Sequence, residues 1–529
     1  MHLPLILTLI ALSGTQKSES RPEVLRQDLQ LRIYPQTGLI KGAATIEITA
    51  RDGDLSSVRF TLNESLEIDS VIDGEHNRRP RRGNRLGVGR AVTIKLTPPI
   101  AVGTSRALTF EYHGKGSAAD EDERDWAGLL VVRADEIRLA SESQWYPQIP
   151  LDDSAHSVLA GLTTLELSLP PGMESLGPGK FVGTSVEDEV VVHNWMSKRA
   201  LRPSLVAGNY DVQNVRAAGR DIRILSFAGH EEGAKLWAQG VGRAIEDLSM
   251  AYGELGYESY SICERRVLNP KNPDRFEASG LSVFDDVQFG GHEVDSMAIA
   301  HDVAHLWFGA EFDAYGEAEE FLTESMALAA ALVSLEVGEG QAAATEAAKL
   351  LSEHYWRDPG KELSVLETNP DAPRHAAVIH AKGVLALRSL RFLSGEEEFD
   401  EVLRKLIGSC AQGKTQPTLD SLLEALRSKF GEGVDDWVRE WLSRPGAPNY
   451  AITYKVEPMG KQTRVSGFLT QKGDLYRTPI EVGVRSSSGR TTYIMIRPRD
   501  RRMIYQAVVP HDVAGVEIDP RYHLLFERE

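Results

Sequence analysis

The stretch "MAIAHDVAHLWFGAEF", residues 297–312, places His301 and His305 four positions apart. No proline interrupts residues 294–309 and most of them suit a helix, so a helix is predicted over this range. Residues four apart in a helix lie on one face, one turn from each other, and two imidazoles placed in this way can converge on one metal ion. The alternative is an ordinary pair of histidines, in the core or at the surface, with common hydrogen-bond partners.

A third candidate ligand lies in the next predicted helix, "EEFLTESMALAAAL", residues 319–332. Glu324 stands there among apolar and small residues, 19 positions after His305. A carboxylate on such a helix is costly to bury without a partner, and a metal ion would supply one. Two neutral imidazoles and one carboxylate also leave a divalent ion with a net positive charge that polarises water. If Glu324 faces solvent instead, the two histidines form no metal site.

Strand-like segments precede this site, from about residue 27 to residue 212. They alternate apolar with polar residues and are separated by Gly, Pro or Asp, which indicates antiparallel sheet and an all-β domain. The clearest segments are "LQLRIYP" (29–35), "GAATIEITA" (42–50), "RALTFEYHG" (106–114) and "TTLELSLPPG" (163–172).

From about residue 231 to residue 443 the pattern becomes that of amphipathic helices, several of which end at glycine. Examples are "GAKLWAQGVGRAIEDLSMAYGEL" (233–255), "KGVLALRSLRFLSG" (382–395) and "TLDSLLEALRSKFG" (418–431). A plausible linker, "SRPGAPNY" (443–450), leads to further alternating segments such as "NYAITYKVEP" (449–458) and "TPIEVGVRSS" (478–487). The sequence therefore predicts a multidomain α+β protein with a small β-sandwich at its end.

Chain length, net charge and cysteine content limit the number of domains and the kinds of partner and site to expect. A chain of 529 residues is long enough for two to four domains, and its formal net charge of -18 argues against a nucleic-acid partner. Cys263 and Cys410 have no spacing that suggests a disulfide framework or a thiolate metal site. Residues 1–20 carry an apolar run from Leu3 to Leu12, which suits a secretory signal peptide and predicts export to the periplasm or the outside of the cell. The alternative is a disordered or buried N-terminus. No later segment is expected to cross a membrane.

The chain resembles a known family. "HDVAHLWFG…FLTESMA" is similar to the pattern of the gluzincin aminopeptidases, the group that contains membrane alanyl aminopeptidase. That pattern is HExxHxWFG followed by a glutamate within LNEGFA, with eighteen residues between the second histidine and this glutamate. Two further family elements, GxMENxGL and YxKG, correspond to "DRFEASGL" and "HAKG" in this chain. The matching positions are His301, His305, Trp307, Phe308, Gly309, Glu324, Glu277, Gly280, Leu281, Lys382 and Gly383.

The resemblance implies an architecture and an activity. After the expected signal peptide at 1–20, it implies an N-terminal β domain at 21–213, a thermolysin-like, mainly helical zinc metallopeptidase domain at 214–446 and a β-sandwich domain at 447–529. It also implies one Zn²⁺ per chain, held by His301, His305 and Glu324. The expected substrate is a peptide with a free N-terminus, whose first peptide bond is hydrolysed through a zinc-bound water.

Two positions of the implied catalytic machinery depart from the family. Asp302 stands where the family has its glutamate base, and its carboxylate is retracted by about 1.5 Å, one C–C bond. A general base must reach its proton at about 2.6–3.2 Å or through one water, so Asp302 is either a weak base or a residual carboxylate. His380 stands where the family has the tyrosine that donates to the developing oxyanion; an imidazole N–H can do the same, or the residue has drifted.

The substrate-binding positions are implied by the same resemblance. Glu277 matches the residue that pairs with the α-amine of the substrate, with Gly280 after it; the alternative is an ordinary glutamate at a strand edge. Glu142, in "ASESQWYP", is a second candidate for binding the amine, whereas Arg374 and His375 carry no assigned role.

Two functions from different classes follow. The first is a zinc aminopeptidase, with activity reduced by Asp302. The second is a catalytically inactive zinc-binding protein that holds peptides or a protein partner in the same cleft.

Overall fold

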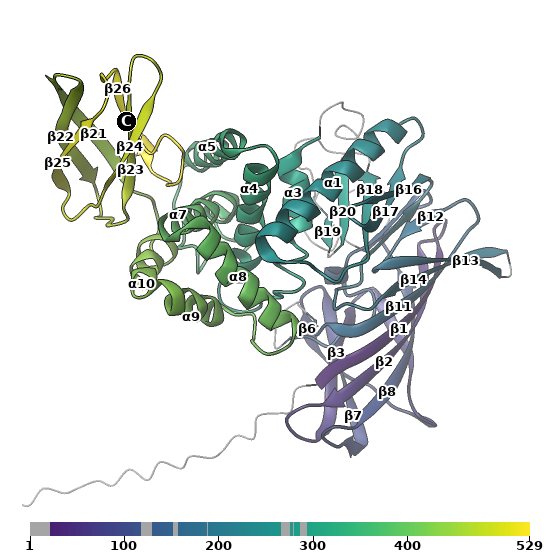
Figure 1. Cartoon of the computed structure of the whole chain (residues 1–529). Coiled ribbons are helices and arrows are strands. Elements are labelled where there is room, and N and C mark those ends of the chain that lie inside the picture. The colour runs from purple at the N-terminus through teal and green to yellow at the C-terminus, as the bar shows by residue number, and fades with distance from the viewer. Residues whose placement is uncertain are drawn as a thin grey trace, which may run out of the picture.

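The computed structural model describes residues 22–117, 130–151, 157–187, 189–265, 276–278, 280–285 and 294–528. The expected signal peptide at residues 1–20 lies outside the described residues. A large β-rich region, a helical region and two small C-terminal sheets follow one another in space as they do in sequence (Figure 1). The expected order of a β-rich region before a helical region is confirmed.

The N-terminal region is built on an eight-stranded sheet of order β13-β14-β11-β1-β2-β8-β4-β5. Apolar side chains at alternate positions of β1, Leu29, Leu31 and Ile33, are buried on one face, as the sequence pattern predicts. Neighbouring strands are antiparallel except β1 and β11, which are parallel and depart from the expected purely antiparallel sheet. The bounds are β1 Pro22–Tyr34, β2 Leu39–Ala50, β4 Leu66–Asp73, β5 His76–Asn77, β8 Ser105–Lys115, β11 Ala160–Leu169, β13 Lys180–Glu187 and β14 Val190–Ser197.

Two smaller sheets complete this region, in the orders β3-β7-β6 and β12-β15-β10-β9. Their bounds are β3 Leu55–Asn63, β6 Arg81–Leu86, β7 Gly89–Ile100, β9 Leu130–Val132, β10 Glu136–Leu139, β12 Glu174–Leu176 and β15 Leu205–Gly208. A short 3₁₀ helix, η2 (Ser141–Ser143), follows β10.

The next part of the chain combines a five-stranded sheet with helices. The sheet has the order β16-β17-β18-β20-β19, so β19 lies at its edge. The strands are β16 Asp211–Ala217, β17 Arg220–Ser226, β18 Ser259–Arg265, β19 Phe276–Ala278 and β20 Leu281–Asp285. The helices are α1 Glu231–Tyr252, α3 Ser296–Ala304, α4 Met326–Gly338, α5 Gln341–Arg357, α6 His375–Ala377, α7 Val384–Ser394, α8 Glu396–Ala411, α9 Leu419–Phe430 and α10 Gly433–Trp437, with π-helical segments η3 Phe321–Ser325, η4 Val378–Gly383 and η5 Val438–Leu442.

The chain ends in two small sheets of orders β25-β22-β21-β27 and β24-β23-β26. Their bounds are β21 Asn449–Met459, β22 Gln462–Lys472, β23 Ile480–Arg485, β24 Thr491–Ile496, β25 Arg502–Val509, β26 Gly515–Ile518 and β27 Glu527–Arg528. One hydrophobic core extends from the helices into these sheets and includes Trp441, Tyr450 and Phe526.

Helix α3 is shorter than the helix predicted over 294–309. It begins at Asp295, whose side chain accepts a hydrogen bond from the backbone N–H of Ala298, and it ends at Ala304. Gly309 has a φ of +134°, a conformation that no right-handed helix contains, so the segment after His305 turns away from the helix axis. His305 still has helical dihedral angles and therefore remains on the face that carries His301.

Close packing joins the helices that surround the histidines. A Cβ atom added at Gly240 on α1 would lie 2.8 Å from Cδ1 of Ile299, so this glycine lets α3 approach α1. The η3 and η4 segments are joined by a hydrogen bond of 2.6 Å from the Ser325 hydroxyl to the Ile379 carbonyl. The residue before Ser325 and the residue after Ile379 are Glu324 and His380, so this contact brings the two candidate site residues to the same place.

One helix within the described residues, Phe321–Gly338, is long and apolar enough to cross a membrane. This corrects the expectation that no segment after the leader has that composition. Of this window, 67% is buried inside the protein, and η3 at its start carries Glu324. Its apolar character is that of a core helix.

Candidate metal centre

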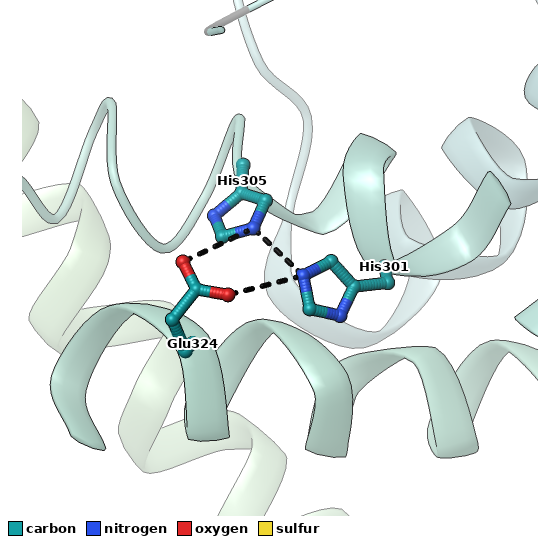
Figure 2. Close-up of side chains that lie close together, drawn as sticks. All are labelled: His301, His305 and Glu324. Carbon is teal, nitrogen blue, oxygen red and sulfur yellow. Dashed lines mark hydrogen bonds and ion pairs between the residues drawn. The ribbon is translucent and has the colours of Figure 1, made fainter. Parts of the chain in front are cut away.

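His301, His305 and Glu324 converge in the helical region (Figure 2). The Nε2 atoms of the two histidines lie 2.9 Å apart, and the Glu324 oxygens lie 3.4 Å from His301 Nε2 and 3.7 Å from His305 Nε2. Ligand atoms placed about 2.05 Å from a tetrahedral zinc ion lie roughly 3.3 Å from one another. The three distances bracket this value, so these side chains fit a single small divalent cation.

The surroundings of the histidines favour this use. Nδ1 of His305 lies 3.1 Å from the carbonyl oxygen of Phe308, so an Nδ1–H donates there and Nε2 is the nitrogen that can coordinate a cation. His301 is 3% exposed, and the Glu324 side chain is 28% exposed. The His305 side chain is 12% exposed, so one buried and one partly buried imidazole lie beside a more open carboxylate, with protein on one side and access on the other.

Asp302 follows His301 on α3 and is buried, with 5% exposure. Within the described part of the chain, the converged group of possible ligands consists of His301, His305 and Glu324, so Asp302 is not one of the donors. The Asp302 carboxylate nevertheless lies in the protein interior, on the residue next to one of these donors.

His380 lies near the three possible ligands. Its Nε2 atom is 3.9 Å from Oε2 of Glu324, which is beyond hydrogen-bond distance, and its side chain is 38% exposed. The histidine at this position therefore sits at the open side of the site. Its role in chemistry stays a prediction.

The two residues proposed to bind substrate lie in the β19–β20 hairpin. Glu277 is in β19 and pairs with Ser282 of β20, but its side chain lies outside the described part of the structure. Gly280 has a φ of +81°, which glycine adopts without strain, and a Cβ atom there would lie 4.0 Å from Cδ2 of Leu306. The hairpin turn is therefore next to the residue that follows His305.

Glu142 lies in η2, in the β-rich region. It acts electrostatically on Arg202: burial lowers the pKa of this guanidinium, but Asp313, Glu142 and Glu319 together raise it above its ordinary value. Arg202 forms its ion pair with Asp313, at 2.7 Å, and the role of Glu142 in binding an amine stays a prediction.

Two residues after His380, Lys382 of η4 forms a buried ion pair with Glu362. Lys382 is fully buried and donates to the Glu362 carboxylate at 3.3 Å and to the Arg444 carbonyl. Burial lowers the pKa of Lys382 to about 8, although Glu362 opposes that shift. Arg374 also pairs with Glu362, so the residue left without a role in the sequence analysis has a structural one.

Sequence reasoning missed a second pair at the open side of the site. His375 Nε2 lies 2.9 Å from Oε2 of Glu320, and the His375 ring contacts the His380 ring edge to face, with centroids 5.6 Å apart. The sequence holds only part of this signal: Glu320 and Glu324 are four positions apart, as on one face of an α-helix, whereas His375 and His380 are five apart. Residues at these intervals share a face of a π-helix or an α-helix.

No protein-family model matches the chain. Aminopeptidase O of Rattus norvegicus is 26% identical over an alignment that covers 38% of this chain and 29% of the length of that protein. An M1 zinc metallopeptidase from Deinococcus radiodurans is 19% identical, with a TM-score of 0.65 over 80% of this chain and 95% of that one.

Two related solved structures contain bound molecules. A mutant of the Deinococcus radiodurans enzyme bound to a Tyr-Ser-Ala substrate has 19% identity and a TM-score of 0.65, covering 80% of this chain and 94% of that one. A two-domain M1 zinc metallopeptidase mutant bound to L-tryptophan has 18% identity and a TM-score of 0.66, covering 81% and 96%. The chain described here has the fold of the M1 zinc metallopeptidases.

Proposed function

We propose that this protein is a zinc-dependent aminopeptidase that hydrolyses the N-terminal peptide bond of peptides, with activity limited by Asp302. The observation that carries the proposal is the convergence of His301, His305 and Glu324, with their ligand atoms all within 4.8 Å of one another, inside the fold of the M1 zinc metallopeptidases. The partial match to Aminopeptidase O supports the same class of reaction.

In this proposal each side chain has a separate task. His301, His305 and Glu324 hold one Zn²⁺, which supplies Lewis-acid chemistry and lowers the pKa of a water. Asp302 accepts a proton as the general base. His380 donates an N–H to the oxygen that becomes negative during attack on the peptide carbonyl.

Substrate binding is assigned to the β19–β20 hairpin. Glu277 pairs with the free α-amine, and a carboxylate facing an ammonium group selects the N-terminal residue. Gly280, with a φ of +81°, forms the turn that lies beside Leu306.

The proposal extends to organisation and location. We place a signal peptide at 1–20, a β domain at 21–213, a thermolysin-like metallopeptidase domain at 214–446 and a β-sandwich domain at 447–529. The apolar run from Leu3 to Leu12 supports export of the mature chain.

A second candidate function is a catalytically inactive zinc protein that binds peptides or a protein partner. The observation that favours it is the replacement of two groups at once, the base at Asp302 and the oxyanion donor at His380, while the three possible ligands remain converged. Zinc binding and peptide binding without hydrolysis are its signature.

The deciding experiment measures zinc content and hydrolysis of aminoacyl-arylamides by purified protein, with and without a chelator. Chelator-sensitive turnover supports the aminopeptidase. One zinc per chain without turnover, in both the unmodified protein and an Asp302→Glu variant, rejects the enzyme and leaves the binding protein. Sub-stoichiometric zinc in protein purified without chelators rejects both.

A further inference from the structure

A continuous row of side chains crosses the open side of the metal centre. Glu320 Oε2 lies 2.9 Å from His375 Nε2, the His375 ring contacts the His380 ring edge to face at 75°, and His380 Nε2 lies 3.9 Å from Glu324 Oε2. Each member contacts the next, so the row runs from Glu320 to one of the proposed zinc ligands.

The backbone explains why these four side chains meet. Glu320 directly precedes η3 and lies four positions before Glu324, whereas His375 begins α6 and lies five positions before His380 at the centre of η4. The hydrogen bond from Ser325 to Ile379 holds the two segments together at this level. Two residues of one segment therefore face two residues of the other.

The inner and outer members of the row differ in exposure. The His380 side chain is 38% exposed, whereas those of His375 and Glu320 are 22% and 23% exposed. Rotation about its two side-chain bonds can redirect a partly exposed ring, and contacts with neighbouring side chains reduce this freedom. The Glu320 carboxylate fixes the His375 ring, and the edge of that ring limits the orientations open to His380.

We propose that Glu320 and His375 are positioning residues that hold His380 in the orientation from which its N–H is directed at the substrate oxygen. The inference rests on the proposed aminopeptidase function. A donor stabilises developing charge well only when it is already oriented, and partners outside the site commonly supply that orientation. The alternative is an ion pair that only stabilises the contact between η3 and η4.

The test compares His375→Ala, His380→Ala and the double variant with the unmodified protein. We expect each single variant to lower kcat by about 10- to 100-fold while KM and zinc content stay unchanged. The reason is that the hydrogen bond from His380 stabilises the transition state and not the bound substrate. The double variant is expected to be no slower than His380→Ala, since His375 acts only through His380. His354→Ala, which removes an exposed histidine from α5, is the matched control and should have unchanged kinetics.

A second pair of variants separates positioning from stability. Glu320→Gln keeps an acceptor for His375 and should retain more kcat than Glu320→Ala. A fall in melting temperature without a fall in kcat in His375→Ala, or losses in the two histidine variants that multiply in the double variant, would overturn the inference.

Calorimetric titration with a phosphinic pseudodipeptide that carries a free amine keeps this test independent of turnover. If the unmodified protein binds zinc but does not hydrolyse peptides, the proposed function fails. The affinity for the pseudodipeptide then measures whether Glu320 and His375 position His380. We expect weaker binding in His375→Ala and His380→Ala, with no further weakening in the double variant. Unchanged affinity in His375→Ala, or no binding in any form, overturns the inference.

Discussion

The side chain of Asp302 is one methylene shorter than a glutamate, which withdraws its carboxylate by about 1.5 Å. If that distance limits the reaction, Asp302→Glu should raise kcat by about 10²–10⁴-fold, the usual contribution of a well-placed general base. Zinc content should not change, because Asp302 is outside the converged donor group of the described residues. Steady-state kinetics on an aminoacyl-arylamide, with metal analysis of the same sample, measure both.

Asp302→Asn is the control for that substitution. It keeps the length of the side chain and removes the charge, so it should abolish the remaining turnover if Asp302 acts as a base. A glutamate variant that is slower than the unmodified protein would instead mean that the site is adapted to the shorter aspartate.

At the far end of the helical region, His523 is buried and stacks on Phe392, with ring centroids 3.9 Å apart. Within the described part of the chain, neither of its ring nitrogens has a hydrogen-bond partner. Burial, reinforced by Arg388, Arg521 and Arg391, lowers the pKa of His523 to about 2. The folded protein therefore keeps this ring neutral where an unfolded histidine, with a pKa near 6.5, becomes charged.

This shift makes the free energy of unfolding depend on pH. Between pH 6.5 and about 2 the unfolded chain binds the extra proton, so stability falls as the pH drops through 6.5, by roughly 2 kcal/mol at pH 5. His523→Phe keeps the stacking and should remove this loss, and urea titrations at pH 7.5 and pH 5 measure it. Burial raises the pKa of Asp519 to about 6, which acts in the opposite direction, but it is common to both proteins and cancels in their difference. Equal acid sensitivity of the two proteins would contradict the prediction.

Among the elements, the contact between η3 and η4 depends on Gly383. A Cβ atom at this position would lie 2.3 Å from the Ser325 hydroxyl oxygen, which is hydrogen-bonded to Ile379. Gly383→Ala should therefore push the segments apart and lower the free energy of unfolding by about 1–3 kcal/mol, despite the better helix propensity of alanine. It should also lower kcat, since Glu324 and His380 lie on either side of this contact.

Gly408→Ala on α8 is the matched control, because a Cβ atom there would meet nothing within 4 Å. The higher helix propensity of alanine is then the main effect, and it should raise the free energy of unfolding by about 0.5–1 kcal/mol. Chemical denaturation should show a lower free energy of unfolding for Gly383→Ala and a higher one for Gly408→Ala. A stabilising Gly383→Ala would show that η3 and η4 have room to adjust.

The elements also show what local sequence could predict. The three converged donors were predictable because helical spacing and the interval to Glu324 are properties of short segments. The helix predicted over 294–309 ends at Ala304, five residues before Gly309 with its φ of +134°, and the pairing of Glu320 with His375 depends on two segments 55 positions apart. Helical periodicity of 3.6 residues does not anticipate the five-residue interval of a π-helical segment.

For the whole molecule, the alternation of apolar and polar residues predicted the strands but not which strands pair in the sheet. The parallel pairing of β1 with β11 joins residue 24 to residue 160, and nothing within either strand specifies it. Long-range pairing is fixed by how the β-rich region closes around its core rather than by the pattern of any single strand. Likewise, the continuity of the core from Trp441 to Phe526 ties the last sheets to the helices, which the linker-like sequence at 443–450 did not suggest.

The metal centre links parts of the chain that the local sequence does not connect, since His301 lies on α3 and Glu324 on η3. A zinc ion that binds only the folded state should stabilise it by about 2.7 kcal/mol when the free ion is at 100 times its Kd. For a cooperatively unfolding unit of about 150–250 residues, this corresponds to a rise in Tm of roughly 5–10 °C. Scanning calorimetry should therefore show a lower Tm after chelation, and the Tm should return when zinc is added back. The His301→Ala variant should melt at the same temperature with and without chelator. If the unmodified protein also melts at one temperature under both conditions, then the convergence of His301, His305 and Glu324 is not a zinc site.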